Sequence, residues 1–419
     1  MANHKRLVIG LFGFGVVGEA LYRVLLNTNS LNAGIKKVCI KQSGKKRNAP
    51  AELFTTNKQE LLNDDEINVI VELIDDQNAA FEIVKTAFVN GKSVVSANKR
   101  MIAEHLEELL RLQKEYKVSF LYEAAACASI PVIRNLEEYY DNDLLQGIKG
   151  IINGSTNFIL TKMTGGKLSR KEALLLAQQL GFAESSPTLD VTGQDAVNKW
   201  VILLNHAFGL IHLPNDLLFH GIQNIDLADV AVADEKKYSL KLVAEAKKLS
   251  NGKIAAFVSP RFLDLSDPLA SVKDEFNGVV IESSFADQQF FYGKGAGGLA
   301  TASAVLSDIS ALRYEYRYEY KKHYHQHAME LTDDFYVNVY VAFSKITDVQ
   351  KEEFESIEEW HVGYFKSYFT GIIHYKKLLE SNWWKQRDIS LILLPDPVIE
   401  DVALRKIKRK SLELAGIAV

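Results

Sequence analysis

The chain has few cysteines, no apolar run of bilayer length and no large excess of charge of either sign. Its two cysteines, Cys39 and Cys127, cannot form a disulfide framework, which favours a reducing compartment. A formal net charge of −4 gives no general attraction for nucleic acid or for an anionic membrane surface. Repeats and low-complexity segments are also absent. With 47% hydrophobic and 24% charged residues, the composition is typical of a folded globular protein.

A chain of 419 residues is too long to fold around one ordinary hydrophobic core, so we expect two or three domains. The N-terminus combines basic residues with an apolar run, as a secretory signal does. Glycines interrupt that run, however, and no small-residue cleavage site follows it. We therefore expect a cytoplasmic protein.

Apolar strands alternate with helices over the first third of the chain. Strands that are apolar on both faces, with helices between them, predict a parallel sheet covered by helices on both sides. The expected strands are Leu7–Phe12, Lys37–Ile40, Asn68–Leu73, Ser93–Ser96 and Ser119–Glu123, and the expected helices are Glu19–Leu26, Gln59–Leu62, Ala79–Asn90 and Ala103–Glu115.

The pattern changes after Gly147, where a strand, a polar turn and a helix start follow one another. A helix over Ser169–Leu180 begins with the spacing of a capping box, and another helix runs from about Gln194 to Phe208. From Val258 to Phe291 the chain predicts strands joined by turns. These turns are expected at Ser266–Pro268 and at Asn277-Gly278, and a glycine-rich turn then leads into a long helix.

The last 85 or so residues predict a ferredoxin-like βαββαβ unit. Its expected elements are strand Tyr336–Phe343, helix Gln350–Trp360, strands His361–Phe369 and Gly371–Tyr375, helix Lys376–Arg387 and strand Ile389–Leu394.

A G-x-G-x-x-G motif follows the first strand and opens the first helix, which is the context of a dinucleotide-binding loop. Gly13 permits the tight turn, Gly15 lets the main chain approach a pyrophosphate, and Gly18 lets the helix pack on the strand. The helix N-terminus then offers free N–H groups to the phosphates. A glycine turn without a ligand is the alternative.

The second strand leads into a basic segment in place of the carboxylate that usually holds the ribose of NAD. Lys41, Lys45, Lys46 and Arg47 stand there and would favour a 2′-phosphate. We therefore expect NADP rather than NAD, with a solvated basic loop as the alternative.

Two lysines occupy positions suited to chemistry. Lys99 follows a strand at the edge where open α/β sheets bind ligands, although a surface lysine at a helix start would look the same. Lys199 lies in an apolar helix one turn after Asp195, and a lysine is rarely buried without a partner. A half-exposed salt bridge is the alternative for that pair.

Taken together, the motifs resemble those of homoserine dehydrogenases. In chain order they are GLFGFGVVG, VVSANK, YEAAACASIPVI (122–133), GIINGSTNFIL (150–160), GFAESSPTLDVTGQDAVNKWVIL and GKGAGGLATASAVLSDI (293–309). The resemblance departs from the family where Cys127–Ser129 replaces common glycines. The resemblance implies a reaction, the NAD(P)H-dependent interconversion of L-aspartate 4-semialdehyde and L-homoserine, in threonine and methionine biosynthesis.

The resemblance also implies roles for particular residues. Lys199 and Lys99 become the catalytic lysines, which stabilise the developing alkoxide and move its proton. Glu184 and Asp195 become contacts to the amino and hydroxyl groups of the substrate, with Asp190 as a further contact. The implied cofactor contacts are Gly13, Phe14, Gly15, Val16, Val17, Gly18, Lys99 and Gly297. The implied ligands of a monovalent cation, Na⁺ or K⁺, are the main-chain carbonyls of Glu123, Ala126, Ala128 and Ile130.

Three domains follow from the resemblance. A Rossmann-type NAD(P)-binding domain takes residues 1–140 and a returning helix at about 298–320. An α+β substrate-binding and dimerisation domain takes residues 141–297, and an ACT-like domain takes residues 333–419. ACT domains usually bind an amino acid at a glycine-containing first loop, which Ser344–Val349 does not provide, so threonine sensing is doubtful. We expect a monofunctional homodimer or higher homo-oligomer that acts on a small molecule.

Two other functions remain open at this stage. An aspartate-semialdehyde dehydrogenase would use Cys127 as its acyl nucleophile. A nucleotide-binding sensor would keep the lysines and carboxylates only as relics.

Overall fold

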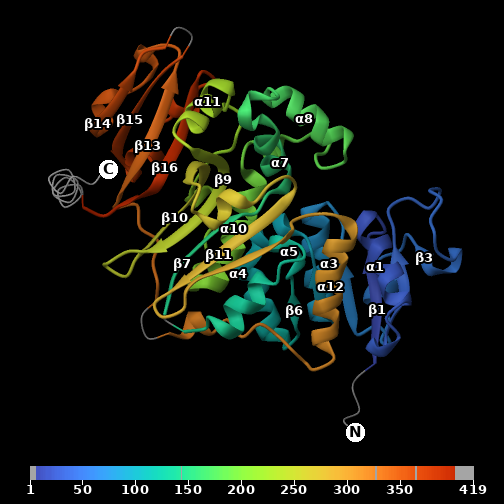
Figure 1. Ribbon diagram of the computed structural model, residues 1–419. Helices are drawn as coiled ribbons and strands as arrows, with labels where there is room; N and C mark the ends of the chain where they lie inside the picture. The colour runs from blue at the N-terminus through green and yellow to red at the C-terminus, as the bar shows by residue number, and fades with distance from the viewer. Residues whose placement is uncertain (1–5, 143, 326–327, 364–365, 402–419) are drawn as a thin grey trace. The chain divides into compact units, whose positions relative to one another are not determined.

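A computed structural model describes residues 6–142, 144–325, 328–363 and 366–401 (Figure 1). These residues form two units. The first unit takes its residues from Met1–Leu145, Asn198–Pro214 and Phe291–Ala328, and the second unit from Gln146–Val197, Asn215–Phe290 and Met329–Val419. Over the described ranges, no helix combines the length and the apolar character needed to cross a bilayer.

The first unit is built on a sheet of six parallel strands in the order β3-β2-β1-β4-β5-β6. This is the strand order of a Rossmann-type doubly wound sheet, in which ligands bind beyond the carboxyl ends of the strands. The predicted parallel sheet is therefore confirmed. The strands are β1 (Leu7–Phe12), β2 (Ala33–Cys39), β3 (Phe54–Thr55), β4 (Val69–Glu72), β5 (Ser93–Ser96) and β6 (Phe120–Leu121).

Helices of the first unit begin at polar caps or glycines. Asp76 accepts hydrogen bonds from the N–H groups of Asn78 and Ala79, and Asn98 accepts one from the N–H of Met101. The returning helix α12 packs on α1 (Figure 1). The helices are α1 (Val16–Leu26), α2 (Gln59–Leu62), α3 (Gln77–Val89), α4 (Lys99–Tyr116), α5 (Ala124–Cys127), α6 (Val132–Arg134) and α12 (Gly298–Leu312), and α10 (Gln194–Phe208) has most of its residues here.

A mixed sheet supports the second unit. Its main path runs β12-β11-β7-β9-β10-β16-β13-β15-β14, and β8 pairs with β10 at the side. β10 and β16 pair in parallel, so the C-terminal strands continue the same sheet. The strands are β7 (Leu145–Ile151), β8 (Leu218–Phe219), β9 (Tyr238–Lys248), β10 (Ile254–Asp264), β11 (Phe276–Ser283), β12 (Asp287–Lys294), β13 (Tyr336–Phe343), β14 (Phe354–His361), β15 (Ser367–His374) and β16 (Ile389–Ile399).

Side-chain caps again fix the helix starts of the second unit. The predicted capping box is confirmed: Ser169 accepts a hydrogen bond from the N–H of Glu172, and Glu172 accepts one from the N–H of Ser169. Asp226 and Asp229 form a second box, which the sequence did not reveal. The helices are α7 (Gly154–Met163), α8 (Arg170–Gln179), α9 (Thr188–Val191), α11 (Leu227–Glu235) and α13 (Tyr375–Glu380).

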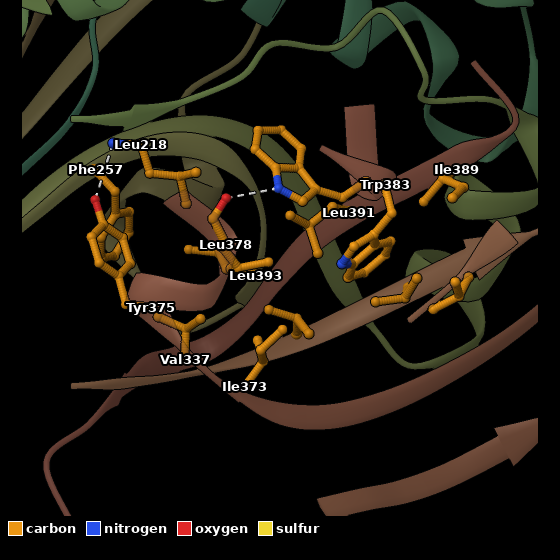
Figure 2. Close-up of a cluster of buried hydrophobic side chains, with 14 of the residues drawn as sticks. Leu218, Phe257, Val337, Ile373, Tyr375, Leu378, Trp383, Ile389, Leu391 and Leu393 are labelled. Carbon is orange, nitrogen blue, oxygen red and sulfur yellow. Dashed lines mark hydrogen bonds between the residues drawn. The ribbon is translucent and has the colours of Figure 1, made fainter. Parts of the chain in front are cut away.

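One apolar core joins the C-terminal strands to β8 and β10 (Figure 2). Leu218 and Phe257 pack among Val337, Tyr375 and Leu393. The Tyr375 hydroxyl accepts a hydrogen bond from the Leu218 N–H at 3.1 Å and donates one to the Ala256 carbonyl at 2.8 Å. Burial of such a cluster, at about 25 cal/mol per Å² of apolar surface, is the main force that holds these strands together.

The helix predicted over Gln350–Trp360 is wrong, because this segment contains strand β14. The glutamates there suggested a helix, but Phe354 and Trp360 pack on Phe369 of β15, with ring centroids 5.0 and 5.5 Å away. The pairing of β14 with β15 at the sheet edge therefore outweighs the local propensity for a helix. The C-terminal elements are thus βββαβ. The strands expected over His361–Phe369 and Gly371–Tyr375 give way to one strand, β15, from Ser367, with residues 364–365 outside the described ranges. The helix expected over Lys376–Arg387 is the short α13.

The turn predicted at Asn277-Gly278 is also wrong, because both residues lie inside β11. Gly278 is needed there for packing: a Cβ atom would lie 2.6 Å from Val272 Cγ2 and 2.9 Å from Phe290 Cε2. The connection between β11 and β12 falls at residues 284–286 instead.

Candidate functional site

The glycine loop between β1 and α1 has the shape that a dinucleotide needs. Gly13 has φ +93°, and a Cβ there would lie 2.5 Å from the Leu73 carbonyl oxygen. A Cβ on Gly18 would lie 2.3 Å from the Gly13 oxygen, so both glycines are required sterically. A Cβ on Gly15 would meet no atom within 4 Å. The open side of the loop is therefore at Gly15, where the N-terminus of α1 can receive a pyrophosphate.

The second glycine loop lies against the first. Gly297 has φ +109° and caps α12, and a Cβ on Gly298 would lie 2.8 Å from Val16 Cγ1. The structure thus places the turn of Gly297 next to the nucleotide loop, and its contact with the cofactor stays a prediction. The side chain of Phe14 packs edge-on against Phe54, with ring centroids 5.0 Å apart. Val16 and Val17 open α1, and Val16 is 77% exposed.

The basic segment after β2 has one anchored residue and three exposed lysines. Arg47 donates hydrogen bonds to the carbonyls of Gln42 and Lys45 at 2.6 and 2.7 Å. Its guanidinium also lies 5.4 Å from the ring centre of Phe54. Arg47 therefore shapes the loop and uses two of its five N–H donors within it. The exposed lysines, which make no ion pair with any described residue, are Lys41, Lys45 and Lys46.

Lys99 is half-buried at the start of α4, directly after the polar end of β5. The neighbouring strand carries a carboxylate that the sequence reasoning missed. Glu72 ends β4 and is fully buried, and it accepts hydrogen bonds from Ser96 Oγ at 2.6 Å and from the Ile74 N–H at 2.8 Å. Burial raises the pKa of Glu72 to about 7. The available signal was a single glutamate at the end of an otherwise apolar strand.

Lys199 is 8% exposed on α10, among the buried residues Val197 and Trp200. Cys127, in the same unit, is fully buried. Burial raises the pKa of the Cys127 thiol to about 12, although the positive charge of Lys199 acts in the opposite direction. A thiol that stays protonated at neutral pH is a poor nucleophile, so the geometry disfavours a Cys127 acyl-enzyme.

The C-terminal half of α10 is held by a buried polar network. His206 Nδ1 lies 2.6 Å from Glu137 Oε1, and His206 Nε2 lies 3.0 Å from the Tyr122 hydroxyl. Lys322 donates a hydrogen bond to the His206 carbonyl at 2.6 Å. His206 lies seven residues after Lys199, two turns along the helix, so this network fixes the helix that carries Lys199.

The segment from Glu123 to Ile130 is also tightly held. Glu123 accepts hydrogen bonds from the N–H groups of Ile133 and Arg134, and its own N–H donates to Asp308 Oδ2 at 2.9 Å. Burial raises the pKa of Glu123 to about 8 and that of Asp308 to about 6, while the charge of Arg134 lowers both. Ala128 adopts φ +47° and ψ −107°, a strained geometry for a residue with a side chain.

The carbonyls proposed as cation ligands lie on this segment. Those of Glu123 and Ile130 already accept N–H groups from Ala126 and Val132 at 3.4 and 2.9 Å. A carbonyl has two lone pairs, so these bonds leave room for an ion. Across the described residues, no group of three or more His, Cys, Asp or Glu side chains is arranged to hold a metal.

The second unit brings two predicted carboxylates together. Asn153 Nδ2 donates hydrogen bonds to Asp190 Oδ1 at 2.7 Å and to Asp195 Oδ2 at 2.8 Å. Asn153 also caps α7, since its Oδ1 accepts the N–H of Thr156 at 2.8 Å. Asn153 is a site residue that the sequence reasoning missed, and its signal was the polar turn after a strand. Asp195 is 5% exposed, so its carboxylate is positioned and largely desolvated.

Glu184 does not join this pair. Its side chain is exposed on the loop between α8 and α9, and it makes no hydrogen bond or ion pair with a described residue. Its main-chain carbonyl accepts a hydrogen bond from Gln178 Nε2 at 2.9 Å. A mobile substrate contact remains a prediction for this residue.

Known proteins share these features. A family model described as "Homoserine dehydrogenase" matches residues 131–310, and one described as "Homoserine dehydrogenase, NAD binding domain" matches residues 13–123. A homoserine dehydrogenase of Corynebacterium glutamicum is 37% identical over 313 residues, which cover 72% of this chain and 70% of that protein.

Solved structures agree with the sequence matches. The crystal structure of a homoserine dehydrogenase from Thiobacillus denitrificans has a TM-score of 0.78 at 26% identity, and the match covers 93% of this chain and 98% of that one. A hyperthermophilic archaeal homoserine dehydrogenase mutant in complex with NADPH has a TM-score of 0.64 at 28% identity, over 75% of this chain and 100% of that one.

Proposed function

This chain belongs to the homoserine dehydrogenase family, and on that premise we propose that Lys199 and Lys99 carry the chemistry of its active site. Members are NAD(P)-dependent oxidoreductases that act on a CH–OH group, and this chain interconverts L-aspartate 4-semialdehyde and L-homoserine. The observation that carries the residue assignments is the Asn153–Asp190–Asp195 cluster, which lies at the start of the helix that presents Lys199.

The nicotinamide supplies or accepts the hydride when it is bound. Reduction of the aldehyde builds negative charge on its oxygen, and an ammonium group beside that oxygen stabilises the charge and delivers a proton. Lys199 suits this role because it is buried on a helix that the His206 network holds in place. Lys99 provides a second cation at the sheet edge where a nicotinamide would lie.

The α-ammonium of the substrate calls for negative charge. Asp195 and Asp190 supply it, and the shared donor Asn153 holds one oxygen of each carboxylate. Glu184, which is exposed, is the third carboxylate that we propose as a substrate contact.

The preferred cofactor is NADP. Lys41, Lys45 and Lys46 are exposed beyond the end of β2, where a ribose 2′-phosphate would lie, and the NADPH complex of an archaeal relative supports the same choice. NAD would be accepted less well. A monovalent cation, Na⁺ or K⁺, would bind the carbonyls of Glu123, Ala126, Ala128 and Ile130, whose main chain is fixed by the bonds around Glu123.

The C-terminal strands support an ACT-like ancestry. Numbered within residues 333–419, the strands lie in the order 2-3-1-4, read along the sheet from β14 to β16, which is the order of a ferredoxin-like sheet. The first helix of that fold is replaced by short 3₁₀ turns at Ile346–Asp348 and Lys351–Glu353. We retain the three domains, 1–140 with 298–320, 141–297 and 333–419, and a homodimer in the cytoplasm, as parts of this proposal.

The direct test is oxidation of NADPH on addition of L-aspartate 4-semialdehyde, followed by the loss of NADPH absorbance. We expect oxidation to require the aldehyde, to be faster with NADPH than with NADH, and to disappear in Lys199→Ala. Equal activity of Lys199→Ala and the wild type would contradict the catalytic assignment. A preference for NADH would contradict only the choice of cofactor.

A further inference from the structure

A cavity of about 720 Å³ in the second unit has an unusual concentration of positive charge. It lies between the end of α7, the end of α11 and the start of β9. The lysines that line it are Lys162, Lys167, Lys237, Lys241 and Lys273. Its volume falls in the range of small-molecule sites, and it shares no lining residue with the Asn153–Asp190–Asp195 cluster.

The two carboxylates in the cavity wall are already engaged. Asp274 Oδ1 accepts a hydrogen bond from Lys162 Nζ at 2.8 Å, so this pair is neutral. Asp234 Oδ2 accepts the N–H of Gly165 at 3.1 Å. One of the five lysines is thus in an ion pair, and the other four outnumber the one remaining carboxylate, Asp234.

Lys241 is the least expected member of the group, because it is only 4% exposed and forms no ion pair with a carboxylate of the described residues. Its ammonium donates to the neutral oxygens of Asn157 Oδ1 and the Val272 carbonyl, at 3.0 and 2.5 Å. An ammonium has three N–H groups, so one remains for another acceptor. Burial and the charge of Lys273 together lower the pKa of Lys241 to about 8, while the charge of Asp274 acts in the opposite direction. A bound anion would offset the unfavourable free energy of burying this ammonium group.

The remaining lysines are exposed at the cavity rim. Lys167, Lys237 and Lys273 make no hydrogen bond or ion pair through their side chains with any residue in the described ranges. They come from three separate elements, so their convergence does not follow from local sequence. Each is therefore available to a ligand at no cost in broken ion pairs.

We propose that this cavity binds a small polyanion that carries at least two phosphate or carboxylate groups. Lys241 contacts the anion from the cavity floor, and Lys167, Lys237 and Lys273 bind its outer groups. The site is separate from the proposed dehydrogenase chemistry, so it can be right or wrong independently of that function.

Isothermal titration calorimetry on the full chain tests the proposal, with pyrophosphate and citrate as separate probes at constant ionic strength. The key variant is Lys167→Ala/Lys237→Ala/Lys273→Ala. A matched control, Lys171→Ala/Lys247→Ala/Lys345→Ala, removes the same charge from exposed positions of the second unit outside the cavity. Pyrophosphate bound at the nucleotide loop would be unaffected by either variant, so the difference between them reports the cavity.

We expect the key variant to bind at least one probe about 10-fold more weakly than the wild type, and the control to change by less than about 2-fold. Loss with pyrophosphate alone identifies a phosphate-bearing ligand, and loss with citrate identifies a carboxylate-bearing one. Equal effects of the two variants, or no binding of either probe to the wild type, would overturn the proposal.

The pH dependence of citrate binding tests the part played by Lys241. Citrate stays fully ionised from about pH 7 to about pH 9, and ordinary lysines keep their charge over that range. Wild-type affinity should therefore fall across this interval as Lys241 loses its proton. Constant affinity would exclude Lys241 from the site.

Discussion

The nucleotide loop of the first unit presents main-chain groups, whereas the acid cluster of the second unit presents side chains. Gly13, Gly15 and Gly18 define an open turn without any polar side chain. Asp190 and Asp195 instead both accept hydrogen bonds from the side chain of one amide, Asn153. The first arrangement is sensitive to added volume, and the second to the loss of a charge or a donor. Each arrangement can therefore be broken by a different kind of substitution.

Both units bury titratable groups of both signs. In the first unit, burial raises the pKa of Glu72 to about 7 and lowers that of Lys322 to about 8. In the second unit, burial raises the pKa of Asp229 and lowers that of Lys241 to about 8. Buried groups whose pKa lies near 7 are common at functional sites.

The largest expected effect is at the lysines of the first unit. Lys199→Ala and Lys99→Ala should each lower kcat by a factor of 100 or more, the usual contribution of a positioned acid–base group. Steady-state NADPH oxidation measures this effect. Lys85→Ala is the control, because it removes an exposed lysine of the same unit from a surface ion pair. A kcat within twofold of the wild type would remove either lysine from the mechanism.

Glu72→Gln should change how stability depends on pH. Between its ordinary pKa of 4.5 and its folded pKa of about 7, Glu72 holds a proton only in the folded protein. The free energy of unfolding therefore falls as pH rises through this window, by about 3 kcal/mol in all. The variant cannot titrate and should lack this loss. Urea unfolding at several pH values measures the difference, and parallel curves for the two proteins would contradict the burial of a titrating Glu72.

Asp195→Asn keeps the shape of the acid cluster and removes one charge. We expect kcat/KM for homoserine to fall about 30-fold, since a hydrogen bond to a charged group contributes about 2 kcal/mol. The matched control is Asp264→Asn, an exposed aspartate at the end of β10. If both variants behave alike in homoserine oxidation assays, Asp195 does not bind the substrate amino group.

Two alanine substitutions separate the open and the packed glycines of the nucleotide loop. Gly15→Ala should weaken NADPH binding about 10-fold at unchanged stability, because its Cβ enters only the open space. Gly18→Ala should destabilise the fold by about 1–3 kcal/mol, because its Cβ meets the Gly13 oxygen. Fluorescence titration with NADPH and urea unfolding give the two readouts. Loss of stability in Gly15→Ala would show that the loop is closed at that position.

Sequence reasoning succeeded best in the first unit. Continuous apolar strands such as Leu7–Phe12 and Ser93–Ser96 lie where they were predicted, because a parallel strand is buried on both faces and needs no alternation. It was weaker in the second unit. Local signals misled at Asn277-Gly278, a dipeptide typical of turns, because packing against Val272 and Phe290 requires the glycine inside a strand.

The same limits apply to the candidate site. Lys99, Lys199 and Asp195 were named from their positions in the sequence and from the family resemblance, and Gly297 from a motif whose next residue, Gly298, the fold does bring to Val16. Asn153 and Glu72 were not named, because each acts through a partner far away in the sequence. The hydrogen bonds from Asn153 to Asp195 and from Ser96 to Glu72 span 42 and 24 residues.

The sequence by itself determined the family, the parallel sheet and the chemical types of the site residues, because glycine loops and buried strands leave local patterns. Tertiary structure alone decided which polar groups meet. Three arrangements join elements that are separate in the sequence. They are the cluster of Asp190 and Asp195 on Asn153, the network that fixes the helix of Lys199, and the convergence of lysines around Lys241. Such contacts arise from packing and burial, whose energies depend on residues that are distant in sequence.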